Sequence, residues 1–385
     1  MRVIANDIEN VMDCSPVKMT ASILADAVGV SVNTIRRIFK RRVETDFYTL
    51  LKLSNFLYPN DETLLKWCYT FERPINICAA MEYMALNNKF DVLKDYISEK
   101  STNTLEKWGD LYTIIMDYTK NNLSDKEMLR KIERFPYGDS DIELINLLKL
   151  VKANTCFRIA SPDSSYLCEM SRLCDEVEDS ITSMKDGFLK ESFNIRMNDL
   201  LGKRALYVRY NIEEARNYAY KNINQKICTF FKANSSYTVG RTFTFESYEK
   251  SVDYTEKAIS EYKDAGFQRF ADDLERYFLP FLNAYHGLGY SEGDFTGGAH
   301  YEAKWGNKKK AKRLLDEAVK REGESTYKMY YRGLANDDED LLFEALSEFL
   351  YIGDKYSAQL PLEQLRKSED PKTRKHAETL YKKFR

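Results

Sequence analysis

The residues best suited to chemistry in this chain are polar and cationic side chains at helical spacing within residues 20–42. They are Ser31, Asn33, Thr34, Arg36, Arg37, Lys40, Arg41 and Arg42. Amide and guanidinium groups can each form two hydrogen bonds to one base edge, that of adenine for asparagine and of guanine for arginine. Asn33 and Arg37 are therefore the best candidates for reading bases, and the cations that end the run are suited to phosphates.

These side chains need a helix that can enter the major groove, and the residues around them predict one. Ala25 is small enough for two helices to approach, and Gly29 can take the left-handed conformation that ends the first helix. Ser31 can cap the second helix, and Ile35 and Ile38 can pack back on the first. The spacing predicts a helix-turn-helix. The alternative is an ordinary helical hairpin whose cationic end is merely solvated.

The distribution of charge favours DNA as the partner. The whole chain has a formal net charge of −2 at pH 7, whereas the cations of the second helix gather within residues 36–42. The positive field is therefore concentrated on one short segment, which suits contact with a polyanion. A lone small domain binds an operator weakly, and high affinity normally comes from a dimer that reads two half-sites. We therefore expect a homodimer on double-stranded operator DNA.

The other chemically interesting residues do not form a catalytic or metal-binding motif. The histidines, His286, His300 and His376, lack the spacing of His-Glu-x-x-His or of a cysteine–histidine site. The glycines between Gly287 and Gly298 miss the spacing of a dinucleotide or phosphate loop. The seven cysteines never form a Cys-x-x-Cys pair and are expected to be reduced. We expect no enzymatic activity, no cofactor and no metal.

Length and composition predict more than one folded unit. With 385 residues and 43% hydrophobic content, the chain exceeds the usual size of a single core. We expect a DNA-binding domain at residues 1–58 and a second domain at residues 59–385, with the join within residues 58–75. No apolar run is long enough to span a membrane, and the N-terminus lacks the apolar core of a signal peptide. A location in the cytoplasm, without membrane contact, is expected.

Residues 59–385 have the pattern of stacked helices. Apolar residues recur at three-to-four spacing nearly throughout, which predicts an all-α chain. Turns are expected near Asn211, Ser247, Asn307 and Asp338, separated by roughly one or two repeats of about 34 residues, the period of tetratricopeptide-like helix pairs. The expected architecture is an N-terminal helix-turn-helix domain followed by a right-handed tetratricopeptide-like α-solenoid. The concave surface of such a solenoid often holds an extended peptide.

Several motifs in the chain resemble those of a known family. In the C-terminal third they are Tyr-Tyr-Arg-Gly-Leu at residues 330–334, Ala-Leu-Ser-Glu-Phe-Leu-Tyr-Ile-Gly-Asp-Lys-Tyr at 345–356 and Leu-Pro-Leu-Glu-Gln-Leu at 360–365. Stretches at residues 47–59, 213–218 and 298–316 agree as well. With these motifs the chain resembles the arbitrium communication-peptide receptors (AimR) of temperate Bacillus phages over essentially its whole length.

This resemblance implies a transcription regulator that senses a peptide. In that family, a peptide-free dimer activates a small downstream gene that favours lysis, and a phage-encoded hexapeptide, commonly ending in Gly-Ala, opposes this activity and favours lysogeny. A ligand that closes the solenoid would change the separation or orientation of the two DNA-binding domains relative to fixed half-sites. Two alternatives stay open, namely a bacterial quorum-sensing regulator of the same plan and a tetratricopeptide scaffold that acts on another protein.

The resemblance also implies site residues. Asp354 and Tyr356 match the acidic and aromatic peptide contacts of the family, and the carboxylate could pair with an arginine or the amino terminus of the peptide. Arg241 could bind a peptide carboxylate. The other implied peptide contacts are Arg204, Val208, Phe230, Thr296 and Glu324, and the sequence departs from the best-known members at Arg204, Val208, Phe230 and Arg241. The C-terminal dimerisation helix of the family corresponds to Leu380, Tyr381 and Phe384.

Overall fold

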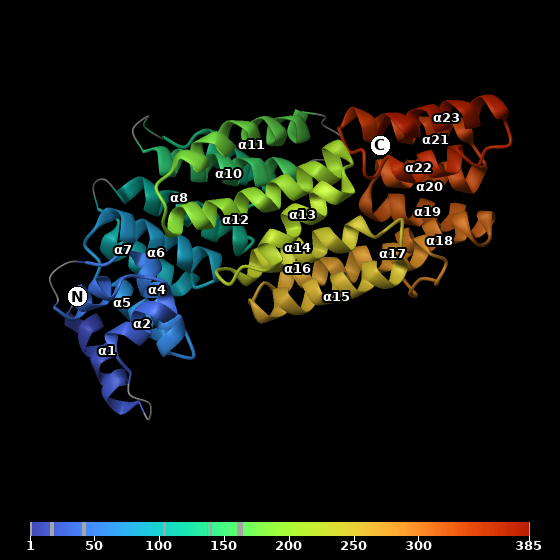
Figure 1. Ribbon diagram of the computed structural model, residues 1–385. Helices are drawn as coiled ribbons and strands as arrows, with labels where there is room; N and C mark the ends of the chain where they lie inside the picture. The colour runs from blue at the N-terminus through green and yellow to red at the C-terminus, as the bar shows by residue number, and fades with distance from the viewer. Residues whose placement is uncertain are drawn as a thin grey trace. The chain divides into compact units, whose positions relative to one another are not determined.

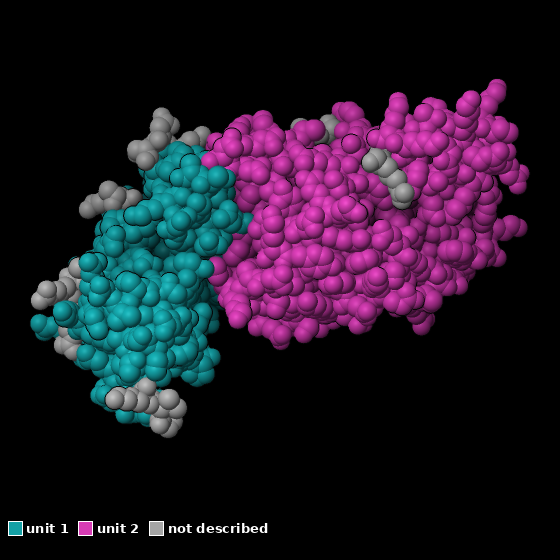
Figure 2. Space-filling model, viewed as in Figure 1, with its two compact units in different colours: residues 1–148, 180–194 teal, residues 149–179, 195–385 magenta. Residues whose placement is uncertain are grey.

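The computed structural model describes residues 2–15, 19–40, 44–102, 105–136, 138, 141–159 and 165–384. All regular secondary structure in these residues is helical, as the sequence predicts (Figure 1). The chain divides into two compact units (Figure 2). Unit 1 comprises residues 1–148 and 180–194, and unit 2 comprises residues 149–179 and 195–385. No helix in the described ranges is long and apolar enough to cross a membrane.

Unit 1 is built around one helix, α6, that is buried along most of its length. Its helices are α1 (Arg2–Cys14), α2 (Ala21–Val28), α3 (Val32–Phe39), α4 (Phe47–Leu57), α5 (Glu62–Cys68), α6 (Pro74–Leu86), α7 (Phe90–Lys100), α8 (Glu106–Thr119) and α9 (Asp125–Glu133). Every residue of α6 from Asn76 to Leu86 is buried, and this helix packs against α4, α5, α7 and α8. A helix that is mostly apolar on all sides belongs in a core, and its buried polar residues Asn76 and Glu82 are hydrogen-bonded. The expected domain boundary at residue 58 falls between α4 and α5, inside unit 1.

The next three helices contribute residues to both units. They are α10 (Ile142–Ile159), α11 (Ser165–Ser183) and α12 (Phe188–Lys203). The first residues of α12, 188–194, belong to unit 1, and the rest of the helix belongs to unit 2. The chain therefore passes from one unit to the other within helices.

Unit 2 is a stack of helices in which neighbours in sequence pack side by side (Figure 1). Two of its elements are π-helices, η2 (Arg204–Arg209) and η3 (Leu274–Phe278). The α-helices are α13 (Ile212–Ile223), α14 (Thr229–Thr242), α15 (Tyr248–Asp264), α16 (Gln268–Asp273), α17 (Leu279–Tyr285), α18 (Phe295–Lys304), α19 (Lys308–Glu322), α20 (Thr326–Asn336), α21 (Glu339–Tyr351), α22 (Gln359–Leu365) and α23 (Pro371–Phe384).

The four turns expected from the sequence are helix starts in unit 2. Asn211, Ser247, Asn307 and Asp338 are the N-cap residues of α13, α15, α19 and α21, and each side chain accepts a hydrogen bond from a backbone N–H of the first turn. Polar caps of this kind satisfy amide groups that have no partner within the helix. The prediction of these turns is confirmed.

Small residues let the paired helices approach closely. At Gly240, on α14, an added Cβ would lie 2.9 Å from Oγ1 of Thr255 and 3.1 Å from the carbonyl oxygen of Ser251, both on α15. The hydroxyl of Ser251 donates a 2.9 Å hydrogen bond to the carbonyl oxygen of Gly240, which fixes the pair at this distance. The result is a closely packed helix pair that holds the C-terminal end of α14 in place.

Candidate functional site

The first candidate surface is the helix-turn-helix formed by α2 and α3. Gly29 has φ 70° and ψ 41°, the left-handed conformation that ends α2. Oγ of Ser31 accepts a 3.1 Å hydrogen bond from the backbone N–H of Thr34 and caps α3. Ile35 and Ile38 are fully buried on the inner face of α3. The local geometry of the motif is as predicted.

The outer face of α3 carries the polar side chains expected at DNA. Asn33, Arg36, Arg37 and Lys40 are exposed. Thr34 is half-buried, and its hydroxyl lies 3.0 Å from that of Ser31. None of the three cations forms an ion pair within the described ranges, so their charges stay available to a partner. The two remaining expected phosphate contacts, Arg41 and Arg42, lie outside the described residues.

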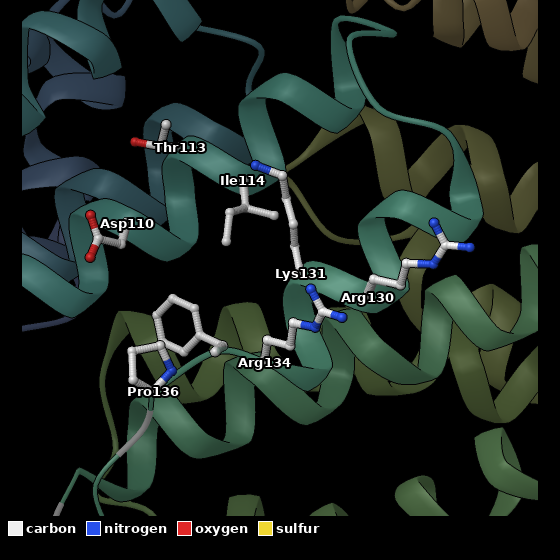
Figure 3. Close-up of a pocket in the computed structure, with 8 residues that line it drawn as sticks. Asp110, Thr113, Ile114, Arg130, Lys131, Arg134 and Pro136 are labelled. Carbon is white, nitrogen blue, oxygen red and sulfur yellow. The ribbon is translucent and has the colours of Figure 1, made fainter.

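Unit 1 also has a hollow of about 420 Å³ between α8 and α9 (Figure 3). It is lined by Asp110, Thr113, Ile114, Arg130, Lys131, Arg134, Phe135 and Pro136. Its cations lie at the C-terminal end of α9, where positive charge stabilises the helix terminus. Their placement therefore has a structural cause, and none of the site residues expected from the sequence lines this hollow.

The second candidate site lies in unit 2, around the guanidinium group of Arg241. Tyr237 lies one turn before it on α14 and accepts a 2.9 Å hydrogen bond from Nη1 of Arg241. Cζ of Arg241 lies 4.5 Å from the ring centroid of Tyr356, 5.0 Å from that of Phe278 and 5.1 Å from that of Tyr207. Nε of Arg241 is buried and has no hydrogen-bond partner among the described residues. The cation is surrounded by aromatic rings and retains an unused donor.

The rings around Arg241 come from elements far apart in sequence. Tyr207 lies on η2 and Phe278 on η3, so each of the two π-helices supplies one ring. Single π-helical turns within α-helices are often found at functional sites. Tyr356 lies between α21 and α22, and its hydroxyl donates a 2.7 Å hydrogen bond to Oγ1 of Thr244. We refer to Arg241, Tyr207, Tyr237, Phe278 and Tyr356 as the arginine cage.

Asp354 adds an opposite charge beside this cage. Its Oδ1 accepts a 2.8 Å hydrogen bond from the backbone N–H of Ser357, as at the start of a helical turn. Burial raises the pKa of the Asp354 carboxyl group, while the hydrogen bonds from Ser357 and the charge of Arg241 lower it. Within the described ranges Asp354 and Arg241 do not form an ion pair, although the charge of Arg241 acts on the Asp354 carboxyl group.

Three other expected peptide contacts have different surroundings. The guanidinium group of Arg204 is buried and donates a 2.6 Å hydrogen bond to Oδ1 of Asp175 on α11. Phe230 packs in a separate aromatic cluster, with its ring centroid 4.5 Å from that of Phe267. Val208 is half-buried on η2. Arg204 therefore pairs with a carboxylate of its own chain, whereas Arg241 lies among the aromatic rings of the cage.

The remaining expected residues lie in unit 2 on α18, α23 and the turn before α20. Thr296 donates a 2.9 Å hydrogen bond to Oε2 of Glu322, and Glu324 accepts one of 3.1 Å from Arg332. Leu380 and Tyr381 pack partly against the core of unit 2. The backbone of Phe384 ends α23, and its side chain lies outside the described residues.

Sequence reasoning missed most of the aromatic rings of the cage. The position of Tyr237 could have been predicted, because Tyr237 lies four residues before Arg241 and so shares its helix face. The positions of Tyr207 and Phe278 could not have been predicted, since a regular α-helical pattern does not indicate where a π-helical turn alters the direction of a side chain.

Similarity to known proteins agrees with this architecture. A family model described as AimR transcriptional regulator-like matches residues 62–367. The AimR transcriptional regulator of Bacillus phage phi3T is 27% identical over 336 residues, which cover 82% of this chain and 84% of that protein. The AimR transcriptional regulator of Bacillus phage SPbeta is 22% identical over 339 residues, which cover 84% of this chain and 85% of that protein.

Solved structures share the fold. The structure described as phAimR-Ligand superposes with a TM-score of 0.65 at 21% identity and covers 85% of this chain and 98% of its own. Selenomethionyl phAimR gives a TM-score of 0.62 and covers 97% of this chain and 99% of its own. Since the family model spans most of the sequence, the resemblance inferred from the motifs is confirmed, and the chain belongs to the AimR family of transcriptional regulators.

Proposed function

We propose that this protein is a DNA-binding transcription regulator of a temperate phage that responds to a short peptide and controls the choice between lysis and lysogeny. A peptide-free homodimer binds operator DNA through α3 and activates transcription. A hexapeptide ending in Gly-Ala binds at the arginine cage and opposes DNA binding or activation. The observation that carries the proposal is the buried Nε of Arg241, which has no hydrogen-bond partner among the described residues and lies inside an aromatic cage.

The chemistry of the cage suits a peptide that presents both charges. A terminal carboxylate can accept two parallel hydrogen bonds from an arginine, and Nε of Arg241 supplies one donor for such a pair. The aromatic rings exclude water from this contact, which strengthens it. An amino terminus or a peptide arginine would then bind Asp354.

The proposed DNA contacts are Ser31, Asn33, Thr34, Arg36, Arg37, Lys40, Arg41 and Arg42. Support for them comes from the exposed cations at α3, which form no ion pair with any described residue, and from the cap and turn that position this helix. Because an isolated helix-turn-helix binds weakly, a dimer is part of the proposal. Leu380, Tyr381 and Phe384 on α23 are the proposed dimer contacts, and the first two are only half-buried in the chain itself.

DNA binding is tested by fluorescence anisotropy with a labelled duplex from the region that flanks the gene. Replacing both Arg36 and Arg37 with alanine removes two cations from α3 and should abolish specific binding. The matched control replaces both Arg130 and Arg134 with alanine, because these arginines are also exposed cations of unit 1. Equal affinity of the two variants would contradict the assignment of α3 and would favour a scaffold protein.

Peptide binding is tested by isothermal titration calorimetry with synthetic hexapeptides that end in Gly-Ala. The change Arg241→Gln removes the charge of the cage and should weaken binding by about tenfold or more, since a hydrogen bond to a charged group contributes about 1.5–3 kcal/mol. The control is Arg216→Gln, because Arg216 also lies over an aromatic ring, 3.9 Å from the centroid of Phe243, and is outside the cage. An Arg241→Gln variant that binds like the parent would contradict the proposed site.

A further inference from the structure

Each end of the helical segment formed by α12 and η2 contacts an aromatic cluster. At the N-terminal end, Phe188 is buried in unit 1. Its ring centroid lies 4.8 Å from that of Phe47 and 6.2 Å from those of Tyr48 and Tyr83. Phe47 and Tyr48 open α4, and α4 packs against α2, the first helix of the helix-turn-helix.

The C-terminal end of the segment forms part of the arginine cage. The helix α12 continues directly into η2, which carries Tyr207. The ring centroid of Tyr207 lies 5.4 Å from that of Tyr356, and its carbonyl oxygen accepts a 2.8 Å hydrogen bond from the backbone N–H of Lys355. Tyr207 is therefore attached to the turn that holds Asp354 through both its side chain and its backbone.

The segment η2 is π-helical, and an α-helical form of the same residues would have a narrower turn. The hydrogen bonds of a π-helix join residues five apart, whereas those of an α-helix join residues four apart, and π-helices are rare. Here the turn closes through a 2.8 Å hydrogen bond from the N–H of Asn211 to the carbonyl oxygen of Ala205, after Tyr210 in a left-handed conformation with φ 54°. Contraction to an α-helix would break this closure and rotate Tyr207 relative to the rest of α12.

We propose that η2 couples occupancy of the arginine cage to α12, and through Phe188 to α4 in the helix-turn-helix unit, with Tyr207 as the residue that makes the connection. A ligand that moves Tyr356 or Arg241 acts directly on Tyr207, because both touch its ring. The inference rests on the proposed function, since it assigns the element by which a ligand of the cage would regulate α3. Such coupling requires an element with two discrete forms, and the equilibrium between these forms must respond to changes at either end.

Hydrogen–deuterium exchange on the full-length protein tests the coupling without DNA or peptide. The change Tyr207→Ala should speed exchange by about tenfold in residues 188–194 and in α4, because these residues lose local stability. The matched control is Tyr237→Ala, which removes a ring from the same cage but lies on α14 instead of the α12–η2 segment. Its effect should stay within unit 2.

The outcomes separate this inference from the proposed function. Faster exchange in α4 for Tyr207→Ala alone supports the coupling, even where no DNA is bound. Unchanged exchange in α4, or an equal change in both variants, overturns it. If Tyr207→Ala does not fold, deletion of Val208 contracts the turn instead and should alter exchange in α4. A Val208 deletion that folds and leaves α4 unchanged also overturns it.

Discussion

His300 provides a prediction whose magnitude follows from its surroundings. It is fully buried on α18, and neither ring nitrogen has a hydrogen-bond partner among the described residues. Its ring stacks on that of Tyr331, with centroids 4.5 Å apart, and also lies near Phe281 and Tyr330. Burial lowers the pKa of His300 to about 3, with a smaller contribution from the charge of Lys304. This histidine is therefore neutral in the folded protein.

The size of the effect comes from comparing the folded and unfolded chains. Between pH 7 and pH 5 an unfolded histidine with a pKa of about 6.5 takes up about 0.7 of a proton, whereas the folded His300 takes up almost none. Because the unfolded state binds more protons, acidification lowers the free energy of unfolding by about 2 kcal/mol through this one residue. The figure hardly changes if the folded pKa moves by a unit, because pH 5 remains well above it.

The assay is urea denaturation of the His300→Phe variant and the parent protein at pH 7 and pH 5, followed by circular dichroism. Phenylalanine keeps a ring against Tyr331 and cannot take up a proton. The variant should lose about 2 kcal/mol less stability than the parent between the two pH values. The change His376→Phe, at an exposed position of α23, is the control. Equal losses for His300→Phe and the parent would contradict a buried, neutral His300 in the folded protein.

Three further changes test other parts of the structure. Asp354→Asn keeps an acceptor for the N–H of Ser357 and removes a carboxylate whose pKa is raised by burial. Because the ionised carboxylate is less favourable in the folded chain than in the unfolded chain, the variant should have a higher melting temperature at pH 7 in differential scanning calorimetry. A lower melting temperature would contradict this. Gly29→Ala should destabilise the helix-turn-helix by about 1–2 kcal/mol in urea denaturation, because φ is 70° and the added Cβ meets no neighbour; unchanged stability would argue against backbone strain. Truncation after Arg374 should give monomers by light scattering, and an unchanged dimer mass would reject the role of α23.

The helix-turn-helix was predictable because its structure depends on local residues. Gly29 and Ser31 act through their own backbone and side-chain geometry, and each has the conformation that its residue type favours. The same holds for the N-caps of unit 2, such as Asn211 and Asp338. Periodic apolar residues then suffice to predict an all-α chain.

The arginine cage was only partly predictable because it depends on long-range packing. Arg241 and Tyr356 were expected at the site, and the structure brings them together from α14 and the turn after α21. Arg204 was also expected there, but Asp175 on α11 holds its guanidinium group. A sequence pattern does not indicate which of several cations finds a carboxylate within the chain, and it does not predict π-helical turns such as the one that presents Tyr207.

In the proposed function, a peptide at the arginine cage controls DNA binding by α3. The most direct test is the fluorescence anisotropy of a labelled duplex from the region that flanks the gene, at a fixed and stated salt concentration, with and without hexapeptides ending in Gly-Ala. We predict specific binding that one peptide relieves in the parent protein and fails to relieve in Arg241→Gln. Specific binding that no such peptide changes, or no specific binding at all, would contradict the claim.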